Sequence, residues 1–188
     1  MRTLVLAFCL LFAAPALAGP IAVSAEAKAE ATLDDLFLRL KKAQIPEQAE
    51  RVADDIQHRW RQSGSATVDL MMGWAGDAAE AKKFDVALDF LDQVTILAPA
   101  YAEGWNRRAT VHFLAEDFSK SMADIEKTLA LEPRHFGALS GMAVILRSAG
   151  REELALKAYE RVLALYPANR EAQAAVSELS EKLTGDRI

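Results

Sequence analysis

Three prolines recur at a fixed interval in the second half of the chain. Pro99, Pro133 and Pro167 are each separated by 34 residues, and a leucine stands two positions before each of them. A proline cannot continue a helix and biases the residue before it towards extended geometry, so regularly spaced prolines mark turns between units of one length. The sequence therefore predicts three tandem units, at 68–101, 102–135 and 136–169, with the prolines in a structural role.

Each unit is expected to contain two helices. The chain has only 9 glycines and 6 prolines in 188 residues, and it is rich in alanine, leucine, glutamate and lysine, which are strong helix formers. Small residues recur at two positions of each unit, twelve residues apart, where two antiparallel helices can approach closely. They are Ala75, Ala109 and Ala143 at the first position, and Ala87, Ser121 and Ala155 at the second.

This pattern resembles the tetratricopeptide repeat (TPR) family over residues 68–169. The resemblance implies an all-α fold, a right-handed superhelix of antiparallel helix pairs, in which the first helix of each unit lines a concave groove. Segment 170–184 is amphipathic and is expected to close the solenoid as a C-terminal capping helix. Segment 32–67 is expected to form a degenerate helical pair, a zeroth unit ahead of the first clear repeat.

The first eighteen residues differ from the rest of the chain. Arg2 supplies a positive charge, residues 4–14 form an apolar run, and residues 16–18 are small or apolar. The run is about half the ~20 residues that a membrane-spanning helix needs. We therefore expect a secretory signal peptide at 1–18, cleaved near Ala18, then a flexible segment at 19–31. We therefore expect a periplasmic protein that is not stably inserted in a membrane after cleavage. A eukaryotic secreted protein is the alternative.

No residues of the sequence form a recognisable catalytic or metal-binding motif. The histidines, His58, His112 and His135, fall in different expected helices or turns, without an HExxH pattern or any other close pairing. The single cysteine, Cys9, lies in the expected signal peptide, and neither a GxSxG elbow nor a glycine-rich phosphate loop occurs. We expect no enzyme activity, no cofactor and no metal, with an enzyme of unrecognised site as the alternative.

The concave side of the repeats is expected to bind a partner. Its lining mixes apolar, amide and guanidinium groups, which suits a peptide or protein segment. The formal net charge of −5 disfavours nucleic acid as a partner. Some TPR proteins hold a C-terminal carboxylate with a lysine and asparagine clamp, but Met72 and Gly76 occupy the first unit's clamp positions, so this activity is not expected. The expected lining residues are Met72, Glu103, Asn106, Arg107, Thr110, Phe113, Ser140, Val144 and Arg147.

Arg108 is expected to have a structural role. It occupies an inward position at which many similar repeats have leucine, and Asp124 lies opposite it on the second helix. A salt bridge between the two would remove the cost of burying the arginine's charge.

The functional hypothesis is an envelope scaffold or adaptor, for maintenance or assembly of the cell envelope. The alternative is an accessory subunit or chaperone of a periplasmic biogenesis pathway, such as cytochrome c maturation, whose factors include similar repeats. Self-association through exposed terminal repeats is also possible.

Overall fold

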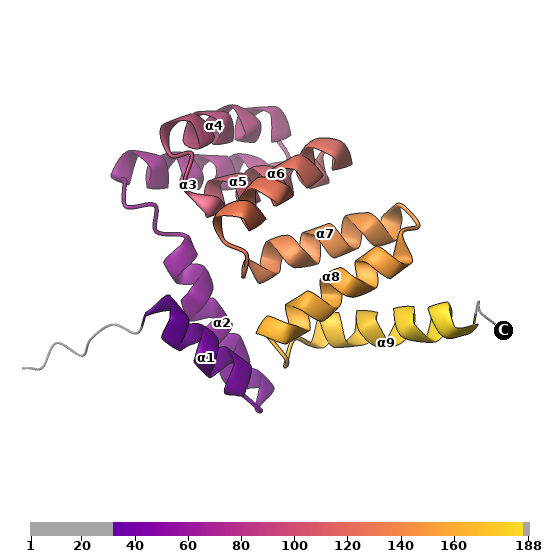
Figure 1. Cartoon of the computed structure of the whole chain (residues 1–188). Coiled ribbons are helices and arrows are strands. Elements are labelled where there is room, and N and C mark those ends of the chain that lie inside the picture. The colour runs from indigo at the N-terminus through magenta and orange to yellow at the C-terminus, as the bar shows by residue number, and fades with distance from the viewer. Residues whose placement is uncertain (1–31, 186–188) are drawn as a thin grey trace, which may run out of the picture. The chain divides into compact units, whose positions relative to one another are not determined.

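The computed structural model describes residues 32–185, which form nine helices and contain no strand (Figure 1). These helices belong to one compact unit. The expected signal peptide at 1–18 and the segment at 19–31 lie outside the described residues. None of the described helices is long and apolar enough to cross a membrane. The helices are α1 (Leu33–Lys42), α2 (Pro46–Trp60), α3 (Ala66–Glu80), α4 (Phe84–Leu97), α5 (Ala102–Leu114), α6 (Phe118–Leu131), α7 (Phe136–Ser148), α8 (Glu152–Leu165) and α9 (Arg170–Gly185).

Helices α3 to α8 form three consecutive pairs, and each pair packs on the next. The small residues lie where the two helices of a pair meet, and Ala75, Ala87, Ala143 and Ala155 are fully buried there. The second pair has Ser121 at this contact, and its hydroxyl donates a hydrogen bond of 2.8 Å to the backbone oxygen of the facing helix. The polar atom is therefore satisfied, and the close approach of the helices is kept.

In each of these three pairs, the two helices are joined by the same left-handed turn. Lys82, Glu116 and Gly150 stand at equivalent positions, with φ angles of 58°, 61° and 71°. The next backbone N–H in each turn bonds back to a carbonyl of the preceding helix at 2.8 Å, as in a Schellman motif. Only the third pair uses glycine here, so the first two turns carry the steric cost of a side chain in this conformation.

The α1–α2 pair is placed differently from the expected zeroth unit. It does not extend the stack ahead of α3. Its apolar face instead joins the core of α7, α8 and α9, at the other end of the repeats (Figure 1). The buried residues that it contributes are Leu36, Phe37, Leu40, Ala49, Val52, Ala53 and Ile56.

Aromatic contacts hold the α1–α2 pair in this position. The Trp60 ring stacks on His135 with centroids 4.1 Å apart and an interplanar angle of 12°, and it also contacts Phe136 at 5.0 Å. The guanidinium of Arg134 lies 4.5 Å from the Phe37 ring centroid and forms an ion pair with Asp34. The sequence pattern showed that these residues were apolar or charged but did not show which distant helix they would meet.

Helix α9 closes the C-terminal end of the repeats. It packs on α8 through Ala172, Ala175 and Leu179, which are buried. Its polar residues make ion pairs with neighbouring helices, from Arg170 to Glu47 of α2 and from Lys182 to Glu152 of α8.

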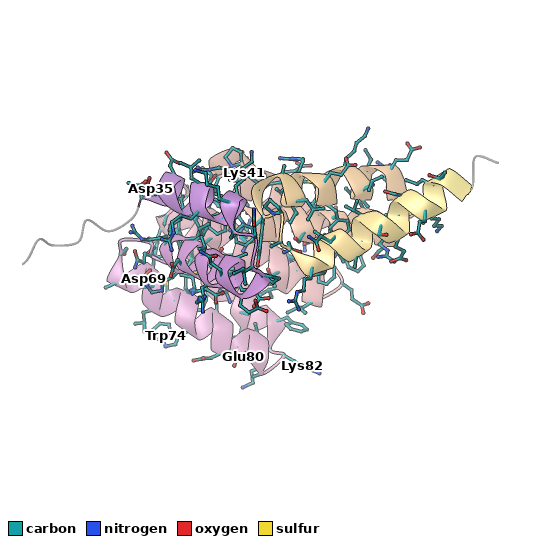
Figure 2. The ribbon with its side chains drawn as sticks, turned by 90° about the horizontal axis from the view of Figure 1, so that it is seen from below. Asp35, Lys41, Asp69, Trp74, Glu80 and Lys82 are labelled. Atoms are coloured by element: carbon teal, nitrogen blue, oxygen red, sulfur yellow. The ribbon has the colours of Figure 1, made fainter. Side chains whose placement is uncertain are left out.

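The outer side of the first pair remains uncovered by the other described helices. Leu70, Trp74 and Val86 are exposed, and Trp74 is 45% accessible. Figure 2 shows Trp74 on α3, at the edge of the molecule. Each later pair packs on the pair before it. Because α1–α2 packs elsewhere, no helix pair among the described residues packs on this apolar side.

Candidate functional site

A groove lies between α5 and α7 and encloses about 170 Å³. We call it the α5–α7 groove. Four of the expected lining residues border it: Asn106, Thr110 and Phe113 on α5, and Val144 on α7. Residues four apart on a helix share a face, so each helix presents a continuous strip to the groove. The remaining lining residues are Ala109, Ser121, Ile125, Gly137, Ala138, Gly141 and Ile145.

Two glycines of α7 widen the groove, and sequence reasoning missed them. Gly137 and Gly141 are four residues apart and precede Val144 on the same face of the helix. A methyl group on Gly141 would meet Ile125 at an ordinary contact distance of 3.5 Å. Packing against Ile125 therefore does not require glycine at this position. The sequence signal that could have identified them is the spacing of two glycines, four residues apart, within a helical pattern.

The chemistry of the groove combines apolar and hydrogen-bonding groups. The rings of Phe113 and Phe118 meet edge to face, with centroids 5.5 Å apart. This contact holds the Phe113 ring in place at one end of the groove. The Asn106 amide donates to Glu103 at 2.9 Å, while its side-chain oxygen has no partner among the described residues. A ligand N–H can therefore bond to Asn106 without displacing an existing hydrogen bond.

Helix α2 forms a wall of a second cavity, which lies next to this groove. This cavity of about 160 Å³ shares Asn106 and Gly137 with the α5–α7 groove. Its other lining residues include Trp60 of α2 and Arg61, which caps that helix, and Tyr101 donates a 2.9 Å hydrogen bond to the Arg61 carbonyl oxygen. This wall exists only because α1–α2 packs beside α7, so no pattern in the α5–α7 sequence could reveal it.

Glu103 lies in this second cavity, where it is buried and its carboxylate is engaged by protein groups. His135 Nδ1 accepts from the Ala138 backbone N–H at 3.1 Å, so Nε2 carries the proton and donates to Glu103 Oε2 at 3.1 Å. Burial alone would raise the pKa of Glu103, but the hydrogen bond from His135 and the charge of Arg107 outweigh it, and the pKa lies below its ordinary value. These contacts indicate a structural role for Glu103.

The other expected groove residues do not border the α5–α7 groove. Met72 is partly buried against the core of the first pair, and Ser140 is partly exposed on α7. Arg147 forms an ion pair with Glu178 of α9, and Arg107 forms a long one, 3.4 Å, with Glu103. Of these, only Arg107 borders the cavity beside α2. Contact between any of them and a partner stays a prediction.

Arg108 and Asp124 form the expected ion pair. Two parallel hydrogen bonds join them, from Nε at 2.8 Å and from Nη2 at 2.7 Å. Arg108 also donates to Asp92 at 2.8 Å and lies over the Trp105 ring, 4.7 Å from its centroid. Asp124 is 6% exposed and Arg108 18%, so the charges are largely withdrawn from water and compensate each other.

His112 lies beside this pair, and its burial leads to a prediction of how the stability of the fold depends on pH. Burial lowers its pKa below 6.5, although Asp124 acts in the opposite direction. The unfolded chain therefore takes up the proton at a higher pH than the folded chain, and stability that is present above about pH 6.5 is lost as the pH falls through the folded pKa. We expect Tm to decrease between pH 7 and pH 5, and the H112Q variant to decrease less. H58Q, at an exposed position, is the matched control, and equal slopes for H112Q and the unmodified chain would contradict the prediction.

Within residues 32–185, no group of three or more histidine, cysteine or carboxylate side chains is arranged to hold a metal ion. His58, His112 and His135 lie on α2, on α5 and at the start of α7, and each has a different neighbour: Gln62, Asp124 and Glu103.

Relatives of the chain share its repeat architecture. A TPR repeat-containing protein of Rhizobium etli is 54% identical over 155 residues, covering 82% of this chain and 76% of the relative. Small glutamine-rich tetratricopeptide repeat-containing protein 2 of Saccharomyces cerevisiae is 25% identical over 126 residues, covering 66% of this chain and 36% of the yeast protein. No protein-family model matches the chain.

Solved structures give the same result. The first TPR of Spaghetti (RPAP3), bound to the HSP90 peptide SRMEEVD, has a TM-score of 0.60 and 25% identity, covering 64% of this chain and 95% of that one. MamA has a TM-score of 0.58 at 15% identity, covering 74% of this chain and 79% of its own, and this likeness shows the fold alone. With three tandem helix pairs, a closing helix and a relative of more than half identical sequence, the chain belongs to the tetratricopeptide repeat family.

Proposed function

We propose that the protein is a non-catalytic scaffold or adaptor that binds a peptide or protein segment in the α5–α7 groove. The observation that carries this proposal is the lining of the groove, where Phe113 and Val144 offer apolar contact beside the hydrogen-bonding groups of Asn106 and Thr110. The TPR fold supports a protein-binding role, and the RPAP3 structure holds a peptide.

An extended segment suits this groove. Its backbone N–H groups need acceptors when they leave water, and the free oxygen of Asn106 provides one. An apolar side chain of the segment fits between Phe113 and Val144. Arg61 and Arg107, beside the groove, favour an acidic residue at the α2 end.

We place this activity in the periplasm, in maintenance or assembly of the cell envelope. The support is the pattern of residues 1–18, with its positive start, apolar run and small residues before the expected cleavage point. An accessory or chaperone role in a periplasmic biogenesis pathway is the second candidate. Fractionation of cells and the mass of the purified protein test export, because cleavage removes about 18 residues.

Crosslinking in cells tests the groove. A photoreactive amino acid at position 106 is expected to give one main adduct. The V144E variant should reduce its yield at least about tenfold, because a charge would be buried against the apolar part of the ligand. I96E adds the same charge at an exposed position of α4 and should leave the yield unchanged. The proposal fails if V144E and I96E behave alike, or if a probe at position 96 captures the same protein.

A further inference from the structure

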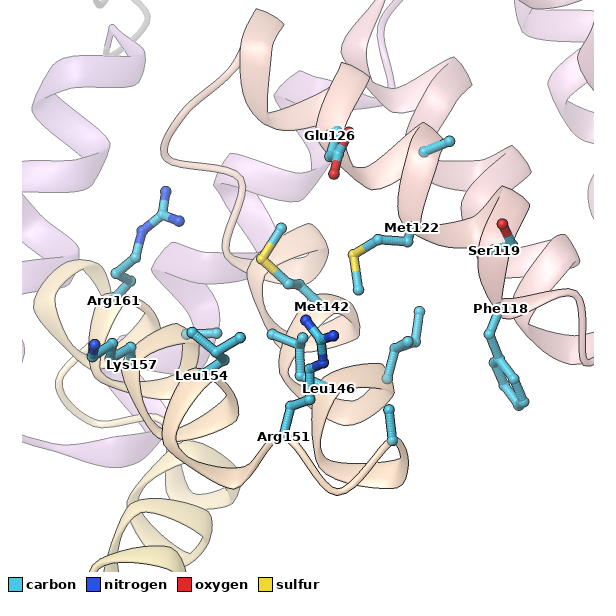
Figure 3. Close-up of a pocket in the computed structure, with 14 residues that line it drawn as sticks. Phe118, Ser119, Met122, Glu126, Met142, Leu146, Arg151, Leu154, Lys157 and Arg161 are labelled. Atoms are coloured by element: carbon cyan, nitrogen blue, oxygen red, sulfur yellow. The ribbon is translucent and has the colours of Figure 1, made fainter.

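A second groove runs between α6 and α8, across α7 (Figure 3). We call it the α6–α8 groove. It encloses about 760 Å³, compared with about 170 Å³ for the α5–α7 groove. Its floor is apolar and contains two methionines, whose flexible thioether side chains adapt to differently shaped ligands. The larger apolar residues are Phe118, Met122, Met142, Ile145, Leu146 and Leu154.

The two grooves use different faces of α7. Gly141 and Val144 face the α5–α7 groove, whereas Met142 and Leu146 face the α6–α8 groove, and Ile145 is the one residue that borders both. Each residue of a helix is rotated by about 100° from the one before it, which separates the two strips. A ligand in one groove therefore leaves the other accessible.

Charge is distributed unevenly along the α6–α8 groove. Arg151, Lys157 and Arg161 follow one another along the α8 side, whereas Glu126 stands on the α6 side, as Figure 3 shows. The three basic side chains are exposed, and none forms an ion pair with another described residue. In a chain with a formal net charge of −5, this is a local concentration of positive charge on one rim.

The apolar floor favours one backbone conformation in the ligand. An extended peptide would lay its N–H and C=O groups against side chains that offer no hydrogen bonds, and this costs free energy. A helix satisfies its own backbone groups and can pack its apolar ridge along Met142 and Leu146.

We propose that the α6–α8 groove binds an amphipathic helix of a partner protein, with acidic residues along one flank of its apolar face. The acidic flank lies beside Arg151, Lys157 and Arg161, and Glu126 disfavours carboxylates on the opposite flank. This second site is independent of the α5–α7 groove and lets one molecule hold two partners.

Two synthetic helical peptides of 18 residues test the proposal. Both carry the same leucine stripe, and one flank has glutamate in the first peptide and lysine in the second. Fluorescence anisotropy with the full chain is expected to show at least about tenfold tighter binding of the glutamate peptide, weakening as salt is added. The R151E/K157E/R161E variant should reverse this order.

Control variants assign the binding to this groove. K41E/K82E/K83E changes the net charge equally at exposed positions elsewhere and should keep the preference for glutamate. M142E should remove binding, whereas V144E, in the α5–α7 groove, should not. Circular dichroism checks that each variant is folded.

Three results would overturn the proposal. The first is equal affinity for the two peptides, and the second is loss of binding in V144E with retention in M142E. The third is a concentration-dependent dimer in sedimentation that the R151E/K157E/R161E variant abolishes, because a second copy of the chain would then be the occupant. None of these results bears on crosslinking at position 106, so the two proposals fail separately.

Discussion

Replacing Asp124 with alanine is expected to lower the free energy of unfolding by about 3 kcal/mol. The substitution leaves the guanidinium of Arg108, whose side chain is only 18% exposed, without its main partner, and the two hydrogen bonds of 2.7 and 2.8 Å are lost. Asp92 stays within 2.8 Å of Arg108, which keeps the loss from being larger. Urea unfolding followed by circular dichroism measures the effect.

Two further variants separate the buried pair from ordinary surface charge. D92A removes a partner that is 56% exposed and should cost about 0.5 kcal/mol, because water screens and replaces that interaction. The double variant R108L/D124A removes both charges together and should recover much of the stability that D124A loses. Equal losses for D124A and D92A would show that Arg108 is solvated rather than dependent on Asp124.

Replacing Trp60 with alanine is expected to cost about 3 kcal/mol and to loosen the α1–α2 pair from the rest of the fold. The ring lies between Phe37 of α1 and the His135 and Phe136 rings at the start of α7, so its removal opens a cavity at that contact. Hydrogen exchange should then increase in α1 and α2 first, while α3 to α6 stay protected, and Tm should fall.

Two variants serve as controls for Trp60. Trp60 Nε1 is buried, and no hydrogen-bond acceptor among the described residues reaches it. W60F keeps the aromatic packing and removes this unpaired N–H, so it should change stability by less than about 1 kcal/mol. W74A removes an exposed tryptophan of the first pair and should also cost less than about 1 kcal/mol. If W60A and W74A were equally destabilising, the docking of α1–α2 would not depend on the Trp60 contact.

The docking of α1–α2 also bears on the proposed function. Arg61, just after α2, borders the cavity that adjoins the α5–α7 groove, so loosening the pair displaces an arginine that the proposal places beside the acidic end of the ligand. Peptide binding and the stability of α1–α2 should therefore change together in W60A.

The sequence alone determined the repeats and four of the residues that border the α5–α7 groove. Proline spacing located the turns between units, because proline ends helices wherever it occurs, and small residues located the helix crossings, because steric bulk is a property of the residue itself. Asn106, Thr110, Phe113 and Val144 were assigned to one lining from their register, since position on a helix fixes the face. The ion pair of Arg108 and Asp124 followed from the need of a buried charge for a partner.

Only the tertiary structure decided where segments distant in sequence meet. The apolar face of α1–α2 packs on Phe136 and the rest of the α7–α9 core, and its composition does not distinguish this end of the repeats from the other. Glu103 occupies a position typical of the groove, but His135, 32 residues away, engages its carboxylate. The α6–α8 groove and its basic rim arise in the same way. The hydrophobic effect is non-directional, so an apolar face does not specify which distant element will cover it. Contacts between distant elements therefore depend on the assembled surfaces rather than on any local pattern.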